Sequence, residues 1–200
     1  MLCAFAFERV GVVVSDLYFL NPYPLDGQES AERGVRLELR VFESGELPGS
    51  MYSARPITIG RPLWRLDLLQ DANAAPNTFD RTHHHPGIVG WEPGPRTFVE
   101  ELSDDPLAWL TSRLTDISSL LHEAGISPDD ISAADADGLR AAAPDIVGTV
   151  RRMLERVWAG ELGRRQVDPV GPDPVGSDVD GPDAGGPDSG VVTSVRVSWL

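Results

Sequence analysis

The spacing of apolar residues changes once along this chain of 200 residues, from a period of two to a helical period. Over residues 35–42, aliphatic side chains alternate with Arg and Glu, as in a strand with one buried face and the other face in water. After residue 103, apolar residues recur every three or four positions, as on an amphipathic helix. Strands followed by helices predict an α+β fold, an antiparallel sheet over 1–100 packed by helices over 104–160.

Other segments of the first half also have strand character. Val10–Val14 and the alternating residues before it predict one long strand, or two that kink at Gly11, beside the strand 35–42. Further short strands are expected over Arg55–Ile59, Leu63–Leu69 and Ile88–Trp91. Between residues 70 and 98 the chain is rich in Asn, Pro, Gly and His, which predicts a long irregular excursion of the kind that often carries function.

Capping residues and prolines mark the expected helices. Ser103–Asp105 followed by Pro106 predicts a helix that continues to Leu121, and Gly125 ends it. A short helix is expected over Ala134–Ala142, and Pro144 is expected to begin the last one.

The end of the chain differs from the rest in composition. Residues 166–190 repeat Gly-Pro-Asp and contain few residues worth burying, which predicts a disordered acidic linker after a single domain over 1–165. Residues 191–200 alternate like a strand again. We expect Val191–Leu200 to pair with the domain's own sheet, and the alternatives are pairing with the sheet of a partner or an unpaired tail.

The charged residues exclude several functions. All 17 basic residues are Arg, so chemistry that requires a lysine amine, such as Schiff-base formation, is excluded. With 31 acidic residues the formal net charge is −14, which argues against a general nucleic-acid binder and favours metal ions or a basic protein partner.

Cys3 is the only cysteine, so neither an internal disulfide nor a multi-cysteine zinc site is possible. The apolar opening Leu2–Phe7 is too short for a signal-peptide core or a membrane span. These features predict a cytoplasmic protein that does not enter a membrane.

Three of the four histidines lie together, at His83, His84 and His85. In extended backbone His83 and His85 project to one side and His84 to the other, so two of them could ligate one ion. A carboxylate must then complete the site, and the candidates nearby are Asp67, Asp71, Asp80 and Glu92. Two imidazoles and one carboxylate suit zinc, iron or manganese, with a coordination position left for water.

A site without a metal is the alternative interpretation of this cluster. Asp67 would orient an imidazole that acts as a general acid or base, while Arg65 or Arg81 would hold a carboxylate or phosphate. The candidate catalytic residues are therefore Arg65, Asp67, Arg81, His83 and His85, and the candidate metal ligands are His83, His85, Asp67 and Glu92.

The blocks Arg61–Leu69, Phe79–Pro86 and Gly90–Pro93 resemble an uncharacterised family of actinobacterial proteins with no assigned activity. The resemblance covers about residues 50–120 and implies no catalytic residue.

More distantly, the chain is similar to small bacterial toxins that act as ribonucleases and carry an Arg-x-Asp strand before a His-rich turn. The corresponding positions are Arg65, Asp67 and His83–His85. The charge of −14 and the absence of Lys argue against RNA as the substrate.

Two hypotheses follow from the sequence. The first is a polar or metal-binding site around the His83–His85 turn and the Arg65/Asp67 strand, with hydrolytic activity and a divalent transition metal as its cofactor. The second is a non-enzymatic acidic interaction module that binds a basic protein partner.

Overall fold

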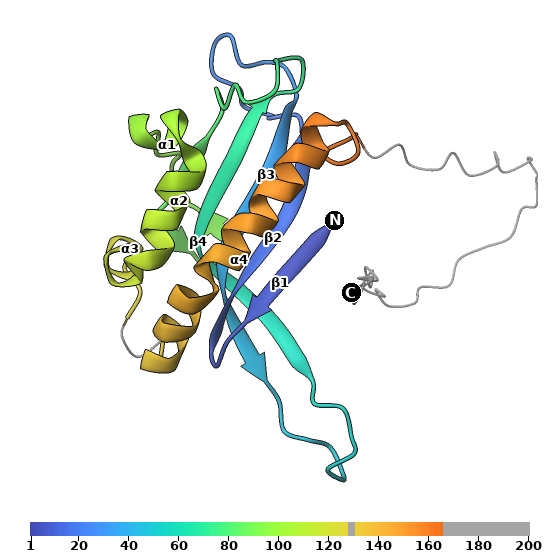
Figure 1. The fold of residues 1–200 in the computed structure, drawn as a ribbon, viewed down its shortest axis with the longest axis vertical. Coiled ribbons are helices and arrows are strands. Elements are labelled where there is room, and N and C mark those ends of the chain that lie inside the picture. The colour runs from blue at the N-terminus through green and yellow to red at the C-terminus, as the bar shows by residue number, and fades with distance from the viewer. Residues whose placement is uncertain (128–130, 166–200) are drawn as a thin grey trace, which may run out of the picture. The chain divides into compact units, whose positions relative to one another are not determined.

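Five antiparallel strands form the central sheet, and they lie side by side in the order in which they follow along the chain. The computed structural model describes residues 1–127 and 131–165. The strands are β1 (Leu2–Ala6), β2 (Val10–Phe19), β3 (Glu32–Ser44), β4 (Ile57–Asp71) and β5 (His83–His85). The ends of β3 and β4 extend beyond the other strands as a long hairpin (Figure 1). The predicted antiparallel sheet is thereby confirmed, including the pairing of β2 with β3.

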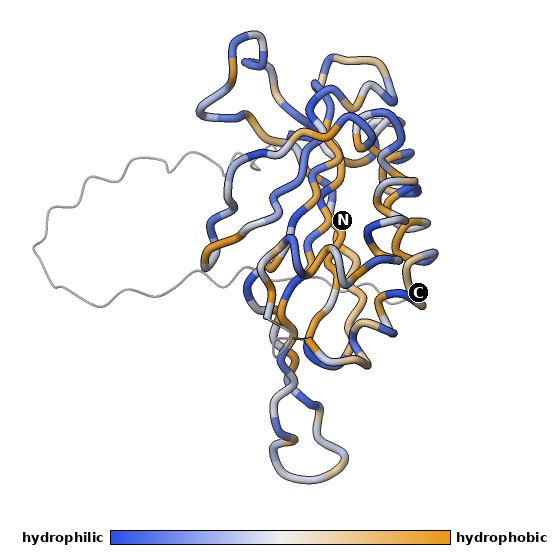
Figure 2. The backbone as a smooth tube through the Cα atoms, turned by 90° about the vertical axis from the view of Figure 1, so that its left-hand side faces the viewer, coloured by the Kyte–Doolittle hydropathy of each residue, from blue (hydrophilic) through white to orange (hydrophobic). Residues whose placement is uncertain are grey.

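The two faces of the sheet have opposite character, because side chains alternate along each strand. Hydrophilic and hydrophobic positions follow one another along the strands in Figure 2. On one face Val12, Leu37 and Leu66 are completely buried in the core. The opposite face carries charged residues, among them Arg36 and Asp67, which stand opposite each other in the register of β3 and β4.

The helices follow the strands and cover the apolar face. They are α1 (Glu100–Asp104), α2 (Pro106–Thr115), α3 (Ile117–Glu123) and α4 (Ala133–Trp158). α4 lies along the sheet in Figure 1, and its buried stripe, which includes Ile146, Val150 and Met153, belongs to the same core as the strands. A small hairpin, β6 (Ile88–Val89) and β7 (Glu92–Pro93), connects β5 to the helices.

Asp135 joins the start of α4 to the turn between β1 and β2. Its side chain and that of Ser132 form a capping box, each accepting from the other residue's backbone N–H. The Oδ1 atom of Asp135 also accepts from the backbone N–H groups of Glu8, Arg9 and Val10, at 2.8, 2.9 and 3.3 Å. Burial raises the pKa of this carboxyl, but these hydrogen bonds outweigh it and hold the pKa below its usual range.

Two predictions about strand boundaries were wrong. The first two strands do not kink at Gly11 but separate earlier, because the chain turns between Ala6 and Val10 and the strands then pair with each other. Residues 57–59 of the first expected strand and all of the second, 63–69, belong to one strand, β4, and the register shifts opposite Arg40 let Pro62 remain inside it.

The helix boundaries also differ from the predictions. The expected helix from Pro106 to Leu121 is divided at Asp116, which caps α3 through the backbone N–H of Ser119. The two helices expected on either side of Pro144 are one helix, α4. Pro144 has no backbone N–H to donate within the helix, but packing on the sheet stabilises the helix across this position. Gly125 follows α3 with a φ of 63°, as expected of a stop signal.

The expected linker 166–190 and the expected terminal strand 191–200 lie outside the described residues. Residues 1–165 form one compact unit by themselves. Within the described part of the chain, no helix is both long and apolar enough to cross a membrane.

Candidate functional site

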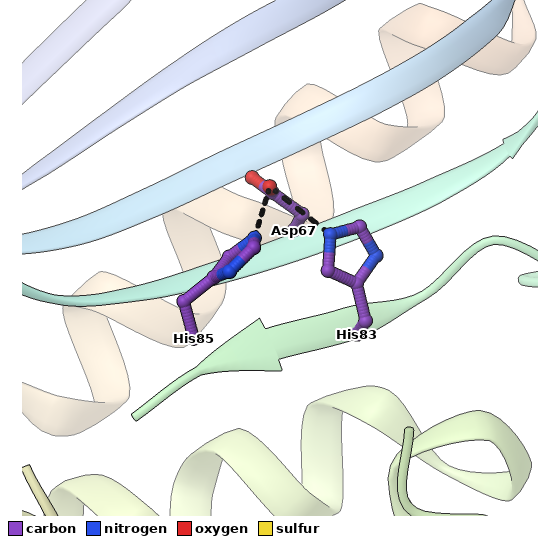
Figure 3. A group of neighbouring side chains, drawn as sticks. All are labelled: Asp67, His83 and His85. Atoms are coloured by element: carbon purple, nitrogen blue, oxygen red, sulfur yellow. Dashed lines mark ion pairs between the residues drawn. The ribbon is translucent and has the colours of Figure 1, made fainter. Parts of the chain in front are cut away.

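The pairing of β4 with β5 brings the predicted histidines and carboxylate together. His83–His85, expected as a turn, is a strand, in which Asp67 stands opposite His83 and Arg65 stands opposite His85. Because opposed side chains of antiparallel strands share a face, Asp67, His83 and His85 all lie on the charged face of the sheet. Figure 3 shows both imidazole rings turned toward the Asp67 carboxylate. His84 occupies the other face, as the alternation predicts.

The three side chains are buried and close together. The Nε2 atoms of His83 and His85 lie 3.5 and 3.7 Å from Oδ2 of Asp67. One ligand atom from each residue lies within 4.8 Å of those from the other two. Among the described residues this is the one group of three or more ligand-type side chains so placed.

Backbone carbonyls determine which nitrogen of each ring carries hydrogen. His83 Nδ1 lies 2.7 Å from the carbonyl oxygen of Arg81, and His85 Nδ1 lies 2.7 Å from that of Gly94. A carbonyl oxygen only accepts, so both Nδ1 atoms donate, and in a neutral ring Nε2 then has a free lone pair. Burial lowers the pKa of His83 to about 4, against the opposing effect of the Asp67 charge, so this ring is neutral near pH 7.

Arg36 on β3 holds the Asp67 carboxylate. Its Nε donates to Oδ1 at 2.7 Å and its Nη2 donates to Oδ2 at 3.0 Å, a bidentate pair. Burial raises the pKa of Asp67, but the polar contact with His85 and the charge of Arg36 outweigh it, so the pKa lies well below its usual range. Asp67 is therefore an anion at neutral pH.

The arrangement places three electron-pair donors around one point. An ionised carboxylate oxygen and two imidazole nitrogens face each other, and the neutral His83 ring offers no hydrogen to the carboxylate from Nε2. Their separations of 3.5 and 3.7 Å are longer than good hydrogen bonds. In a tetrahedral zinc site with bonds of about 2.0–2.1 Å, neighbouring ligand atoms are about 3.4 Å apart. The spacing observed here is therefore close to that of ligands around one ion.

The other predicted site residues have different partners. Arg65 donates to Glu38 on β3, through Nε at 2.9 Å and through Nη2 at 2.8 Å. Arg81 lies within 3.6 Å of Asp71 and 3.4 Å of Asp80, and it joins them to the loop before β3. Glu92, on β7, does not belong to the group of potential ligands.

The sequence analysis did not predict that Arg36 and Glu38, two charged residues of β3, belong to the surroundings of the site. It expected their face of the strand to be in water. Glu38 is buried, and Arg36 is only partly exposed. The sequence did contain an indication of these pairs. The charges alternate as Arg36, Glu38 on one strand and Arg65, Asp67 on the other, so that in the observed register each residue faces one of opposite charge. Sequence alone does not provide the register that aligns the two pairs.

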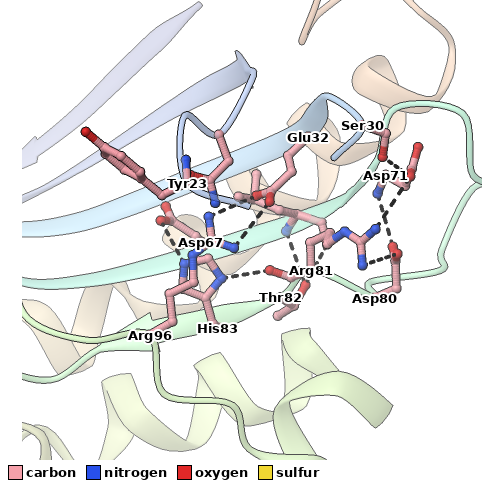
Figure 4. A network of polar contacts seen from close by, with 12 residues as sticks. Tyr23, Ser30, Glu32, Asp67, Asp71, Asp80, Arg81, Thr82, His83 and Arg96 are labelled. Carbon is pink, nitrogen blue, oxygen red and sulfur yellow. Dashed lines mark hydrogen bonds and ion pairs between the residues drawn. The ribbon is translucent and has the colours of Figure 1, made fainter. Parts of the chain in front are cut away.

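Beyond Asp67, His83 and His85, the network of polar contacts continues along the strand ends (Figure 4). Arg96 donates to the completely buried Glu32 at 3.2 and 3.4 Å. Asp71 accepts from Ser30, at the other end of the network. The first pair fastens the segment after β5 to β3, and the second fastens the segment before β3 to β4.

The helical side of the molecule carries a separate acidic groove of about 670 Å³. Glu101, Asp104, Asp105 and Asp116 line it together with Trp109. A basic partner stays a prediction, since a groove of this charge does not by itself identify an occupant.

Comparison with models of protein families, with curated proteins and with solved structures found no match to this chain. The two resemblances noted from the sequence therefore stay predictions, and the site is interpreted from its own geometry.

Proposed function

We propose that Asp67, His83 and His85 bind one divalent transition-metal ion, and that the protein uses this ion for hydrolysis. The observation that carries the proposal is the convergence of a carboxylate oxygen and two imidazole Nε2 atoms within 4.8 Å of one another, in rings that both donate from Nδ1 to a backbone carbonyl. An ion of charge +2 would form three ligand bonds with these atoms. Zinc, iron and manganese all accept this set of ligands.

The surroundings of the three residues resemble the outer shell of metal sites. Both histidines donate from Nδ1 to a backbone carbonyl, which orients the ring and increases the basicity of the ligating nitrogen. The carboxylate is itself held by a hydrogen-bond donor, Arg36. Three protein ligands leave a coordination position for water, which a divalent ion makes acidic enough to attack an ester near neutral pH.

The experiment is a metal analysis of protein purified without a histidine tag. We expect about one equivalent of a transition metal per chain, retained after dialysis, in the wild-type protein. The double variant His83→Gln/His85→Gln is expected to lose it, while His122→Gln, a change on helix α3 away from the site, retains it. His84→Gln is the sharper control, since it changes the same tripeptide on the opposite face of the sheet.

Absence of metal from the wild-type protein, before and after incubation with zinc or manganese, would reject the proposal. So would equal metal content in the double variant and the wild type, provided that circular dichroism shows both to be folded.

A further inference from the structure

The part of the charged face nearest Arg65 and His85 carries more positive than negative side chains. Arg36, Arg40 and Arg65 lie on this face with only two carboxylates between them, Asp67 and Glu38. Arg96 and Glu32 form a further pair of opposite charge. These side chains alone sum to +1 in a chain whose formal net charge is −14, and a divalent ion would raise that sum to +3. Further along β4, Arg81 pairs with Asp71 and Asp80.

One carboxylate is shared by two of these arginines. Glu38 receives Arg65 at 2.8 Å and Arg40 at 3.3 Å. Arg40 is the less firmly held of the two, because its Nε is buried and has no hydrogen-bond partner. Its guanidinium carbon lies 5.4 Å from the ring centre of Trp91, a residue that is 61% exposed. One N–H group of Arg40 therefore has no hydrogen-bond partner among the described residues.

The arginines around the site are more exposed to solvent than the three proposed ligands. The side chains of His83, Asp67 and His85 are 1%, 2% and 8% exposed. Those of Arg65, Arg40 and Arg36 are 13%, 19% and 25% exposed. Within this cluster the guanidinium groups are therefore the parts most open to contact with a ligand from solvent.

We infer that the substrates of this site are phosphate monoesters, bound with the phosphoryl group between the metal position and the guanidinium groups of Arg40 and Arg65. The inference rests on the proposed function. A dianion compensates most of a local charge of +3, whereas a carboxylate or a phosphodiester carries one charge only. Guanidinium groups also match the geometry of phosphate oxygens with paired N–H donors.

The proposed reaction is hydrolysis of the ester. Water adds to phosphorus through its oxygen, the bond from phosphorus to the ester oxygen breaks, and the alcohol leaves with one proton of the water. Phosphate and alcohol are the products, and no oxidant or reductant is required. The arginines would neutralise the charge that the phosphoryl oxygens carry in the transition state.

The test is a binding titration by calorimetry near pH 8 with the metal-loaded chain. Inorganic phosphate and methyl phosphate are compared with dimethyl phosphate and acetate, which carry a single charge. We expect the two dianions to bind at least about tenfold more tightly than the two monoanions. Arg40→Gln should weaken phosphate binding about tenfold without changing the metal content, and Arg40→Lys should restore part of the affinity. Arg140→Gln, which removes an exposed pair with Asp137 on α4, is the matched control.

Equal or tighter binding of dimethyl phosphate or acetate would overturn the substrate class. Unchanged phosphate affinity in Arg40→Gln would overturn the proposal that the phosphoryl group binds at the Arg40 guanidinium. If the wild-type chain holds no metal, the proposed function fails by itself, and the titration is carried out on the metal-free protein. Phosphate binding that depends on Arg40 would then support the anion site alone, and absence of binding would reject it.

Discussion

Acidification should destabilise the metal-free protein through His83. Burial lowers the pKa of this imidazole from 6.5 to about 4 in the folded state, because its charged form loses water. Between these two values the unfolded chain binds a proton that the folded chain does not. Stability is therefore fully present above about pH 6.5 and falls as the pH decreases toward 4.

The magnitude follows from the two pKa values. Each unit of difference corresponds to about 1.4 kcal/mol, so the whole effect is about 3 kcal/mol. Between about pH 7.5 and about pH 4.5 the loss assigned to His83 is about 2–3 kcal/mol. The lowered pKa of Asp67 acts in the same direction, but mostly at lower pH, because an unfolded aspartate titrates near 3.9.

The assay is urea unfolding in the presence of a chelator at both pH values, for the wild type and for His83→Gln. The variant should lose about 2–3 kcal/mol less than the wild type on acidification. His84, whose pKa is also lowered by burial, contributes equally to both proteins and cancels in the difference. Identical pH dependence in the two proteins would refute the reasoning, because His83 would then titrate alike in the folded and the unfolded chain. His122→Gln serves as the control and should behave like the wild type.

Four further substitutions test other parts of the structure by urea unfolding of the metal-free chain. Asp67→Asn should cost about 3 kcal/mol because it leaves Arg36 without its anion, and no loss would show that their pair is not formed. Asp135→Ala should cost about 3 kcal/mol through lost backbone acceptors and a lost helix cap, with faster amide exchange in the turn over 7–9. Gly11→Ala should cost about 1–3 kcal/mol, since a Cβ there would lie 2.5 Å from the carbonyl oxygen of Phe5. Gly87→Ala, with open space around it, should change stability by less than about 0.5 kcal/mol, and equal effects of the two glycine changes would contradict the packing described.

The fold class could be predicted because apolar periodicity is a local property. The alternation over 35–42 indicates a strand with one buried face, and the helical spacing after residue 103 indicates helices with one buried face. A window of a few residues is therefore enough to tell a strand from a helix. The same locality explains the errors. Pro144 disrupts a helix in isolation, but the core contacts on both sides of it, among them Leu139 and Ile146, keep α4 continuous.

The candidate site divides in the same way between local pattern and tertiary structure. That His83 and His85 share a side follows from the alternation of an extended backbone, and the sequence alone determines it. That they face Asp67 depends on the register of β4 and β5, because a shift by one residue would turn Asp67 to the other face.

The role of Arg36 and Glu38 was decided by the tertiary structure alone. Their charges suggested a face in water, but the pairing of β3 with β4 sets them against Asp67 and Arg65 and withdraws both pairs from solvent. Buried charges are stable only when paired, and pairs between strands depend on the register of distant segments. The residue types of the site are thus a property of the sequence, while their protonation, orientation and charge balance arise only where the strands meet.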